Sequence, residues 1–472
     1  MGDLLYIQTA QKIADQVKGG TYQPGDRIPA VRQLSKQFKV SVSTVLQAYG
    51  LLEDQGIIEA RPQSGYYVRD RLWQPPAEPE ISTPATFPTV VNVGELAMEV
   101  LRITRRTDII QLGTAIPDPK FLPTQAIHRI ISSLARHQAD QCSPYDFPPG
   151  NDELRRQIAR RTLDAGCQLG ADNIVITSGC QEALALCLRA VAQPGDIIAI
   201  ESPTFYGLLQ AIESLGMQVL EIPTHPRDGI SLEALSLAIE QWNVKACVVV
   251  PSNSNPLGYC MSDDKKRQLV KLLAGHNIPL IEDDIYGELG FDLTRPVAAK
   301  SFDTNGNVLY CSSFSKTLSP GLRVGWVAAG RYQKKVAYLK FLSSIATATL
   351  PQIAIAEFLS SGGYDRYLRK VRGLYRQQTE RMLQAVSQWF PQGTRVTQPA
   401  GGFVIWVELP AHVDSLQLLG KALEKNISFA PGQLFSAKQK YKNYIRLNCA
   451  QPWNETIDKA VMTLGHLVDQ AG

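Results

Sequence analysis

The sequence predicts an α/β protein with a separate, mostly helical domain at its N-terminus. Two observations predict this fold class. Seven short apolar runs alternate with helical stretches in the C-terminal part, and a proline-rich segment separates them from an N-terminal part with helical periodicity. The length of 472 residues also favours more than one domain, because a single hydrophobic core stops growing near about 250–300 residues.

The C-terminal part, residues 108–472, is predicted to be a doubly wound domain with a mainly parallel, seven-stranded sheet. Each apolar run is almost continuously hydrophobic, which is typical of strands covered by helices on both faces. From Gln398 onward the pattern changes, and a smaller α+β subdomain is expected at about residues 394–472. The predicted strands are Asn173–Thr177, Asp196–Glu201, Val219–Ile222, Ala246–Val250, Pro279–Asp283, Asn307–Ser312 and Gly325–Ala328.

Residues 73–107 are predicted to be a linker between this body and an N-terminal head of residues 1–72. The segment Trp73–Pro88 holds five prolines and lacks strand alternation, so an extended and partly polyproline-like conformation is expected. A long loop within one domain is the alternative.

Composition excludes several classes of protein. Hydrophobic residues make up 44% and charged residues 19% of the chain, as in soluble globular proteins. No apolar run is long enough to span a bilayer, and Met1-Gly2-Asp3 does not begin an export signal. The eight cysteines have no paired CxxC spacing, which argues for free thiols in a reducing cytoplasm and against zinc or disulfides.

The head is predicted to hold three helices followed by a β-hairpin. The helices are Tyr6–Lys18, Val31–Phe38 and a third that begins after the N-cap Ser41 and stops at Gly56. The strands Ile57–Arg61 and Tyr66–Val68 follow. This order is that of a winged helix-turn-helix, whose third helix enters the major groove while the wing contacts backbone or minor groove.

The stretch PGDRIPAVRQLSKQFKVSVSTVLQAYGLLEDQGIIEARPQSGYYV resembles the head of the GntR family of bacterial regulators over its whole length. The resemblance implies binding to double-stranded DNA, with Arg32 on a phosphate at the start of its helix; a winged helix that binds proteins is the alternative. The residues expected to contact DNA are Arg32, Ser41, Ser43, Thr44, Gln47, Arg61, Ser64 and Gly65.

Two features distinguish this head from the heads of proteins that bind DNA strongly. Family members often carry arginines where this chain has Val42 and Leu46, so base preference is expected to rest on other residues. Through Leu72, nine basic and seven acidic residues leave a net charge of only +2. We therefore expect one head to bind DNA weakly, and two heads on one dimer to be needed for useful affinity.

The strongest chemical signal is the segment Ser312–Trp326, SSFSKTLSPGLRVGW. Lys316 follows a buried strand, and a lysine held out of water near a cation forms imines readily, because its amine stays unprotonated. Arg323 can serve both as that cation and as a bidentate phosphate ligand. The hydroxyls of Ser313 and Ser315 suit the same phosphate. In isolation, one lysine near one arginine is more often a surface pair.

Three further motifs follow other strands, and each alone has an ordinary turn as its alternative. One places free backbone amides at a helix start, where an anion binds. A second offers a hydrogen bond to a phenolate oxygen. The third places a carboxylate at the end of an apolar strand, where a protonated ring nitrogen can pair with it. The first motif is Gly179, Cys180 and Gln181, the second is Asn255 with Tyr286, and the third is Asp283. Glu282 and Asp284, the neighbours of Asp283, are expected to be solvated.

Together these motifs resemble fold-type-I pyridoxal-phosphate enzymes of the class I aminotransferase family, from about Asp108 to the C-terminus. The resemblance implies a pyridoxal 5′-phosphate cofactor with Lys316 as the catalytic lysine. It also implies that Tyr145 reaches a neighbouring subunit's phosphate and contributes to effector binding. Phe205 would stack on the cofactor ring, where tyrosine is commoner, and Arg446 would bind the α-carboxylate of a substrate or effector.

A GntR head joined to an aminotransferase-like body is the arrangement of the MocR subfamily, and the chain is identified as a member. Membership implies a cytoplasmic homodimer that regulates transcription and senses pyridoxal phosphate, or an amino acid or amine, through aldimine chemistry. An active aminotransferase with a secondary DNA-binding head is the alternative, because the catalytic set is intact. A scaffold that binds cofactor without turnover or response is a third, weaker hypothesis.

Overall fold

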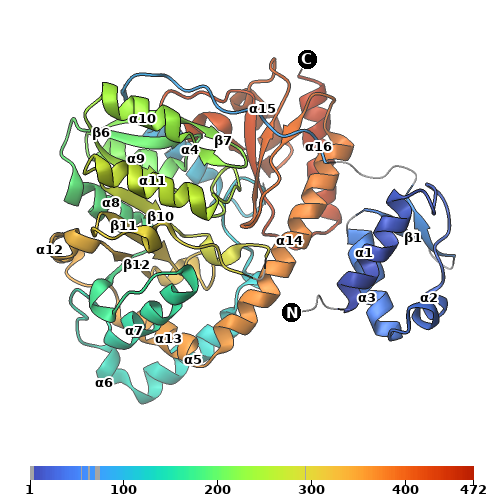
Figure 1. The fold of residues 1–472 in the computed structure, drawn as a ribbon, viewed down its shortest axis with the longest axis horizontal. Coiled ribbons are helices and arrows are strands. Elements are labelled where there is room, and N and C mark those ends of the chain that lie inside the picture. Colours follow the sequence, from blue (N-terminus) through green and yellow to red (C-terminus); the bar gives the residue numbers. More distant parts are fainter. Residues whose placement is uncertain (1–4, 55, 62–63, 70–74, 293, 472) are drawn as a thin grey trace. The chain divides into compact units, whose positions relative to one another are not determined.

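The computed structural model describes residues 5–54, 56–61, 64–69, 75–292 and 294–471. The chain forms two compact units (Figure 1). The smaller unit comprises Met1–Pro76 with Glu380–Phe390, and the larger one Ala77–Thr379 with Pro391–Gly472.

The head contains the predicted three helices and hairpin. The helices are α1 (Leu5–Lys18), α2 (Val31–Phe38) and α3 (Val42–Asp54), and the strands β1 (Ile58–Arg61) and β2 (Gly65–Val68) pair antiparallel. Helix α3 begins where predicted, because the Oγ of Ser41 accepts a hydrogen bond from the Thr44 amide at 3.1 Å.

One hydrophobic core holds the head together. Ile13 of α1, Leu34 of α2 and Val45 of α3 are almost fully buried in it. Burying a side chain of this size contributes about 1.5–3 kcal/mol relative to exposure. The hydroxyl of Tyr49 donates to the carbonyl of Pro29, which ties α3 to the start of α2.

The larger unit is built on one nine-stranded sheet that contains all seven predicted strands. The spatial order is β3-β7-β6-β9-β10-β11-β12-β5, with β8 beside β7. The four pairings among β7, β6, β9, β10 and β11 are parallel, whereas β12 is antiparallel to both of its neighbours. The strands are β3 (Thr89–Val90), β5 (Val175–Thr177), β6 (Ile197–Ser202), β7 (Gln218–His225), β8 (Gly229–Ile230), β9 (Val244–Val249), β10 (Leu280–Asp283), β11 (Val308–Ser313) and β12 (Gly325–Ala328).

Helices cover both faces of this sheet (Figure 1), which explains why its strands are hydrophobic throughout. Along β6, Ile198 and Ile200 pack toward α8, α9 and α12, while Ala199 between them packs toward α10 and α11. Strands β9, β10 and β11 alternate in the same way. The helices are α8 (Cys180–Val191), α9 (Tyr206–Ser214), α10 (Leu232–Gln241), α11 (Asp263–Gly275) and α12 (Gln333–Ser344).

A four-stranded antiparallel sheet forms the predicted small subdomain. Its order is β13-β14-β17-β16, and Arg446 of β17 lies opposite Trp406 of β14. Its elements are β13 (Arg395–Val396), β14 (Val404–Glu408), α15 (Ser415–Glu424), β16 (Ala430–Pro431), β17 (Tyr444–Asn448) and α16 (Glu455–Asp469). A two-stranded pairing of β4 (Ile110–Gln111) with β15 (Ile427–Ser428) joins it to the rest of the unit.

Another helical layer packs on the β5 end of the large sheet. There Ile176, Tyr310 and Trp326 contribute to a core with residues of this layer. The helices are α5 (Thr124–His137), α6 (Ala139–Cys142), α7 (Asp152–Thr162), α13 (Thr349–Ser360) and α14 (Gly363–Trp389).

The predicted linker, residues 73–107, differs from the structure over its described part. From Ala77 onward it belongs to the larger unit, and it includes β3 and the helix α4 (Gly94–Ile103). The carbonyl of Ala77 accepts from the Val396 amide at 2.8 Å, and Ser82 exchanges two hydrogen bonds with Thr224. Proline lacks an amide donor but keeps its carbonyl, so a proline-rich segment can still be held against a folded surface.

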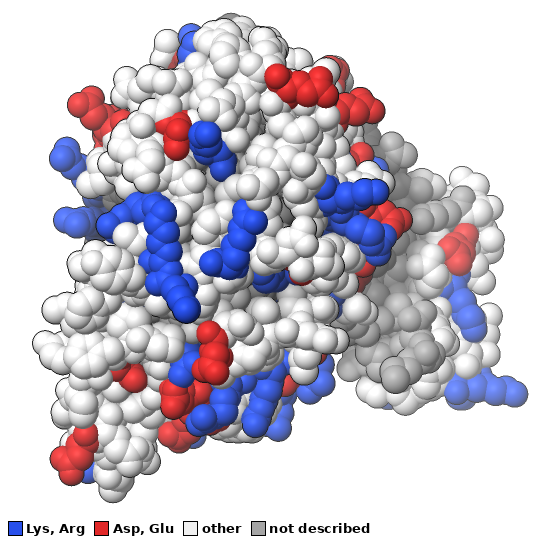
Figure 2. Space-filling model, turned by 60° about the vertical axis from the view of Figure 1, so that its left-hand side comes forward, with Lys and Arg blue, Asp and Glu red and all other residues white. Residues whose placement is uncertain are grey.

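Among the described residues, no helix combines the length and the apolar character that crossing a bilayer requires. Figure 2 shows basic and acidic side chains interspersed on one face of the protein, in keeping with a net charge of only +4.

Candidate cofactor site and DNA-contacting surface

A cavity of about 230 Å³ opens in the larger unit next to the carboxyl ends of β9, β10 and β11. In open α/β sheets ligands bind at this edge, because parallel strands bring their following loops together there. The cavity is lined by eighteen residues. Those predicted from the sequence are Cys180, Gln181, Phe205, Asn255, Asp283, Tyr286, Ser315, Lys316 and Arg323.

Lys316 lies in the turn after β11, and its Nζ donates to the carbonyl of Ala115 at 2.6 Å. Burial lowers the pKa of Lys316 to about 8, and the nearby Arg446 lowers it further than Arg323 does, against the opposing effect of Asp283. The sequence identifies Arg323 as the cation that keeps this amine unprotonated. Arg446, distant in sequence, makes the larger contribution.

Arg323 lies against the start of α8 and has the geometry of an anion ligand. Its Nη1 donates to Ser315 Oγ at 3.2 Å, and its Nη2 donates to the Ser178 carbonyl at 2.9 Å. Gly179 has φ +91°, a conformation that side chains rarely adopt, and a Cβ on it would crowd the guanidinium of Arg323. This guanidinium, the Ser315 hydroxyl and the first amides of α8 form a donor set suited to a phosphate.

Asp283 ends β10 almost fully buried. Burial raises the pKa of this carboxyl to about 6, although hydrogen bonds from Cys180 Sγ at 3.3 Å and from the Ile285 amide at 3.2 Å oppose the shift. A buried carboxylate with a raised pKa gains stability from a cationic partner. The position therefore suits a protonated heterocyclic nitrogen in the cavity.

Asn255, Tyr286 and Arg446 form a polar chain along the cavity wall. Nδ2 of Asn255 lies 3.4 Å from the Tyr286 hydroxyl, and its Oδ1 accepts from Arg446 Nη1 at 3.0 Å. Arg446 is fully buried, and its Nη2 donates to the Gly113 carbonyl. Among the described residues, its Nε has no hydrogen-bond partner. A buried guanidinium with a free donor favours an anionic ligand beside it.

The other predicted residues lie at different distances from this cavity. Phe205 lines it, and the side chain of Gln181, which also lines it, donates to the Gly207 carbonyl at 2.6 Å. Ser313 lies instead along a second, smaller cavity, with its Oγ accepting from the Ser315 amide at 3.3 Å. Tyr145 is 70% exposed and packs on Phe147, so its predicted contact with a neighbouring subunit remains a prediction.

Sequence reasoning missed part of the cavity wall. Leu101 and Thr104 come from the end of α4, inside the segment predicted as a linker, and Tyr206 lies beside Phe205. The apolar spacing in GELAMEVLRI is helical and was available as a signal. The prolines before this helix led instead to the prediction of an extended linker.

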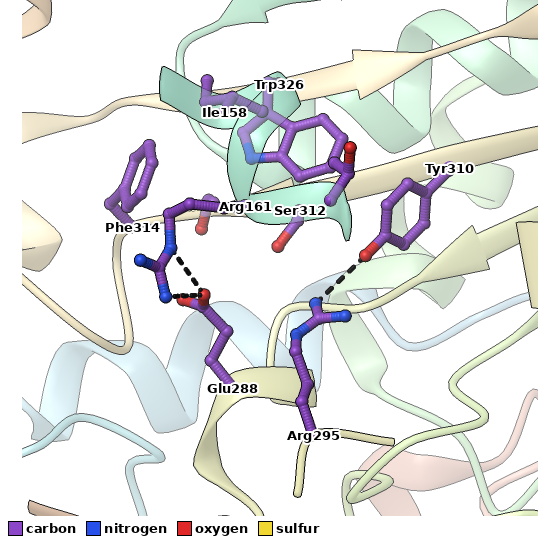
Figure 3. A pocket seen from close by; sticks show the side chains of 10 residues that line it. Ile158, Arg161, Glu288, Arg295, Tyr310, Ser312, Phe314 and Trp326 are labelled. Carbon is purple, nitrogen blue, oxygen red and sulfur yellow. Dashed lines mark hydrogen bonds and ion pairs between the residues drawn. The ribbon is translucent and has the colours of Figure 1, made fainter. Parts of the chain in front are cut away.

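The acidic neighbours of Asp283 show that one prediction was wrong. A partner of one of them, Arg295, lines the second cavity, which has a volume of about 30 Å³ (Figure 3). Glu282 and Asp284, expected to be solvated, are both buried. Asp284 accepts from Arg295 and, at 2.6 Å, from the Tyr310 hydroxyl, while Glu282 accepts from the Ala299 and Lys300 amides at 2.8 Å. One arginine, one tyrosine hydroxyl and two backbone amides from the following segments satisfy these two carboxylates, and inspection of the acidic run alone does not reveal them.

Arg161 and Glu288 form a second ion pair along this cavity, with Nη2 of the arginine 2.7 Å from the carboxylate (Figure 3). The nearby arginine and the hydroxyl of Tyr364 hold the pKa of Glu288 below its usual value despite its burial. These ion pairs lie along a cavity that Ser312 and Ser313 also line, at the end of β11 and shortly before Lys316.

The head presents its predicted DNA-contacting residues largely to solvent. Arg32, Ser41, Ser43 and Gln47 are exposed, and Thr44 is half-buried. The hydroxyl of Ser41 is hydrogen bonded to those of Ser43 and Thr44 at 2.8 and 2.7 Å, so these side chains also form the N-terminal cap of α3.

In the wing, Arg61 and Ser64 make local contacts. The guanidinium of Arg61 bonds Glu59 at 2.8 Å and lies 4.5 Å from the ring centre of Tyr67. Ser64 Oγ lies 2.7 Å from the Tyr67 hydroxyl. Gly65 has φ +113°, a conformation that favours glycine at the end of the turn.

Comparison with known proteins shows the class of protein to which the chain belongs. Residues 5–68 match the family of bacterial regulatory proteins, gntR family, and residues 107–464 match aminotransferase class I and II. Two Escherichia coli proteins named as uncharacterized HTH-type transcriptional regulators, YjiR and YdcR, are each 40% identical over 98–99% of this chain and 99% of their own length. Kynurenine aminotransferase from Pyrococcus horikoshii, solved in complex with PMP, covers 79% of this chain and 94% of its own at 30% identity, with a TM-score of 0.74.

The fold and the matched regions together define a GntR-type helix-turn-helix regulator fused to an aminotransferase-like domain. The chain belongs to the MocR type of this family. The predicted winged head and fold-type-I body are therefore both confirmed.

Proposed function

We propose that this protein is a transcription regulator whose head binds operator DNA and whose body holds pyridoxal phosphate to capture an amino acid. The observation that carries the proposal is the environment of Lys316. Its amine has a pKa lowered to about 8 and faces a cavity that also contains Asp283 and the donor set around Arg323.

The residues present fit the cofactor. Arg323, Ser315 and the start of α8 would hold the phosphate, and Gly179 leaves room for that guanidinium. Asp283 would pair with the protonated ring nitrogen, and this pairing would lower the raised pKa of the Asp283 carboxyl. When bound, pyridoxal phosphate supplies an aldehyde that condenses with amines. Lys316 supplies the amine that retains it, and Phe205 is positioned to stack on its ring.

Arg446 favours an effector with a carboxylate over a simple amine. Its guanidinium is buried beside the cavity-lining Asn255 and keeps a donor nitrogen without a partner among the described residues. Arginine binds carboxylates through two parallel hydrogen bonds. An α-amino acid would thus bring its amine toward Lys316 and its carboxylate toward Arg446.

DNA binding and effector capture would be linked through a homodimer. The weak net charge of the head favours two heads acting together. An effector changes the DNA affinity only if it binds one arrangement of the protein more tightly than another. We therefore propose that effector capture in the body alters the spacing or orientation of the two heads.

A working aminotransferase is the second candidate function. It is favoured by the intact constellation of Lys316, Asp283, Asn255, Tyr286 and Arg446 around one cavity. In that case Lys316 would also move a proton between the substrate α-carbon and the cofactor. A sensor needs the same residues to capture its effector, so their presence fits both functions.

Visible absorbance of the full-length protein tests the proposal. After loading with pyridoxal phosphate, the protein is mixed with amino acids and with matched amines that lack the carboxylate. A spectral shift that persists for one amino acid, but not for its decarboxylated analogue, supports the sensor. Loss of the cofactor band with release of keto acid supports the aminotransferase. A protein without a cofactor band under any condition would refute both.

A further inference from the structure

The DNA-facing end of α3 is apolar and uncharged. The helix, VSTVLQAYGLLED, contains no lysine or arginine. Near its N-terminus the side chains of Val42 and Leu46 are 44% and 49% exposed. Residues four apart lie on one face of a helix, so these two side chains are neighbours. Gln47 and Ser43 are exposed beside them.

These apolar side chains have no role in the core of the head among the described residues. The core is formed from a neighbouring face of α3 by Val45, Tyr49 and Leu52, each with none of its surface exposed. Val42 and Leu46 belong neither to that cluster nor to the partly buried side chains around it. Single exposed apolar residues are ordinary on protein surfaces. Two such side chains side by side, within the first turn and a half of the helix that is expected to enter the major groove, instead indicate a contact surface.

We propose that the head recognises A·T base pairs in the major groove, with Val42 and Leu46 contacting thymine methyl groups and Gln47 contacting adenine. The inference rests on the proposed DNA-binding function. In the major groove only thymine presents a methyl group, and apolar side chains recognise it by contact, whereas glutamine pairs with the N6 and N7 atoms of adenine. Guanine is most often read by arginine or lysine, which α3 lacks.

Positive charge is placed where it would position the head without reading bases. Arg32 and Lys36 on α2 and Lys39 at its C-terminal end are exposed. Contacts with phosphates fix the register of a protein on the duplex and carry no sequence information directly. Cations on α2 would thus contact the phosphates, and uncharged side chains on α3 would contact the bases.

The test begins with selection of bound duplexes from a random DNA library by the full-length protein loaded with pyridoxal phosphate. We expect A·T pairs to be enriched within each half-site. The selected duplex is then synthesised with deoxyuridine in place of single thymidines, which removes only the methyl group. At contacted positions the affinity should fall about fourfold, the value of one buried methyl group.

Variants assign the contact. In Leu46→Ala or Val42→Ala, deoxyuridine should no longer weaken binding at the thymine that the truncated side chain contacted. Ile7→Ala, which truncates a side chain of similar exposure on α1, should keep the full deoxyuridine effect. Gln47→Ala should reduce the preference for adenine at one position without changing the response to deoxyuridine.

Two results would overturn the inference while leaving the DNA-binding function intact. One is a selected site without enriched A·T pairs. The other is a deoxyuridine effect that is absent at every thymine or unchanged in both truncation variants. Failure of the full-length, cofactor-loaded protein to bind any duplex would instead refute the proposed function on which the inference rests.

Discussion

The cofactor cavity and the exposed face of α3 are assembled in opposite ways. The cavity brings together residues from across the body, and Arg446 alone is hydrogen bonded to a carbonyl 333 positions away. The α3 face consists of neighbours between Ser41 and Gln47. Side chains around the cavity have buried partners, so losing one leaves another unsatisfied. Those on α3 face water, so the loss of any one leaves no buried partner unsatisfied and is expected to have a smaller effect.

The sharpest test of the cavity is Lys316→Ala, for which we expect complete loss of covalent cofactor attachment. The variant removes the amine that faces the cavity and should leave the fold intact, because the Ala115 carbonyl that loses its hydrogen bond also lines the cavity and can bind water there. Borohydride reduction followed by mass spectrometry measures the bond. A cofactor still reducibly attached to the variant would show that another residue holds it.

Arg446→Lys should weaken amino-acid binding about 100-fold. Truncating one partner of a buried, charged hydrogen-bond pair costs about 2–5 kcal/mol, and 2.8 kcal/mol corresponds to about 100-fold. Lysine keeps the charge beside Asn255 but cannot bind a carboxylate with two parallel hydrogen bonds.

Titration of the bound cofactor's absorbance with the amino acid measures this loss. The cofactor band before addition serves as the control for folding and should be unchanged. Equal affinity for an amino acid and its decarboxylated amine in the unmodified protein would contradict the role of Arg446.

The rate of cofactor attachment should rise about tenfold per pH unit below pH 8 and level off above it. The pKa of Lys316 is lowered to about 8, so the reactive, neutral amine is the minor form at pH 6 and the major form above pH 8. An ordinary lysine would continue to gain reactivity up to about pH 10. Stopped-flow absorbance after mixing with pyridoxal phosphate distinguishes the two profiles.

On the head, Arg32→Ala should weaken binding only modestly, by about three- to tenfold, and equally for specific and random duplexes. A phosphate contact carries no direct sequence information, and its loss should lower the slope of log affinity against log salt by about 0.9 per head.

Fluorescence anisotropy at several salt concentrations measures this effect. Arg136→Ala, which removes an exposed arginine from α5 in the body, is the matched control. An unchanged affinity and slope for Arg32→Ala would remove Arg32 from the interface.

Much of the site could be predicted because its parts are local signals. Lys316 and Arg323 lie seven residues apart in one segment that follows an apolar strand. Asp283 was recognisable because a carboxylate at the end of so apolar a run needs a partner. The neighbouring Glu282 and Asp284 were misjudged, because Arg295 and the backbone amides that pair with them belong to other segments.

The sequence by itself determined the elements of this protein: the helix caps of the head, the seven apolar strands and the motifs that end them. These depend on residues within a few positions of one another, where periodicity and capping act. Only the tertiary structure decided that residues 77–107 join the body, that Arg446 lies close enough to Lys316 to lower its pKa, and that α4 closes the cavity wall. Such contacts depend on how distant segments pack, and no local pattern records that packing.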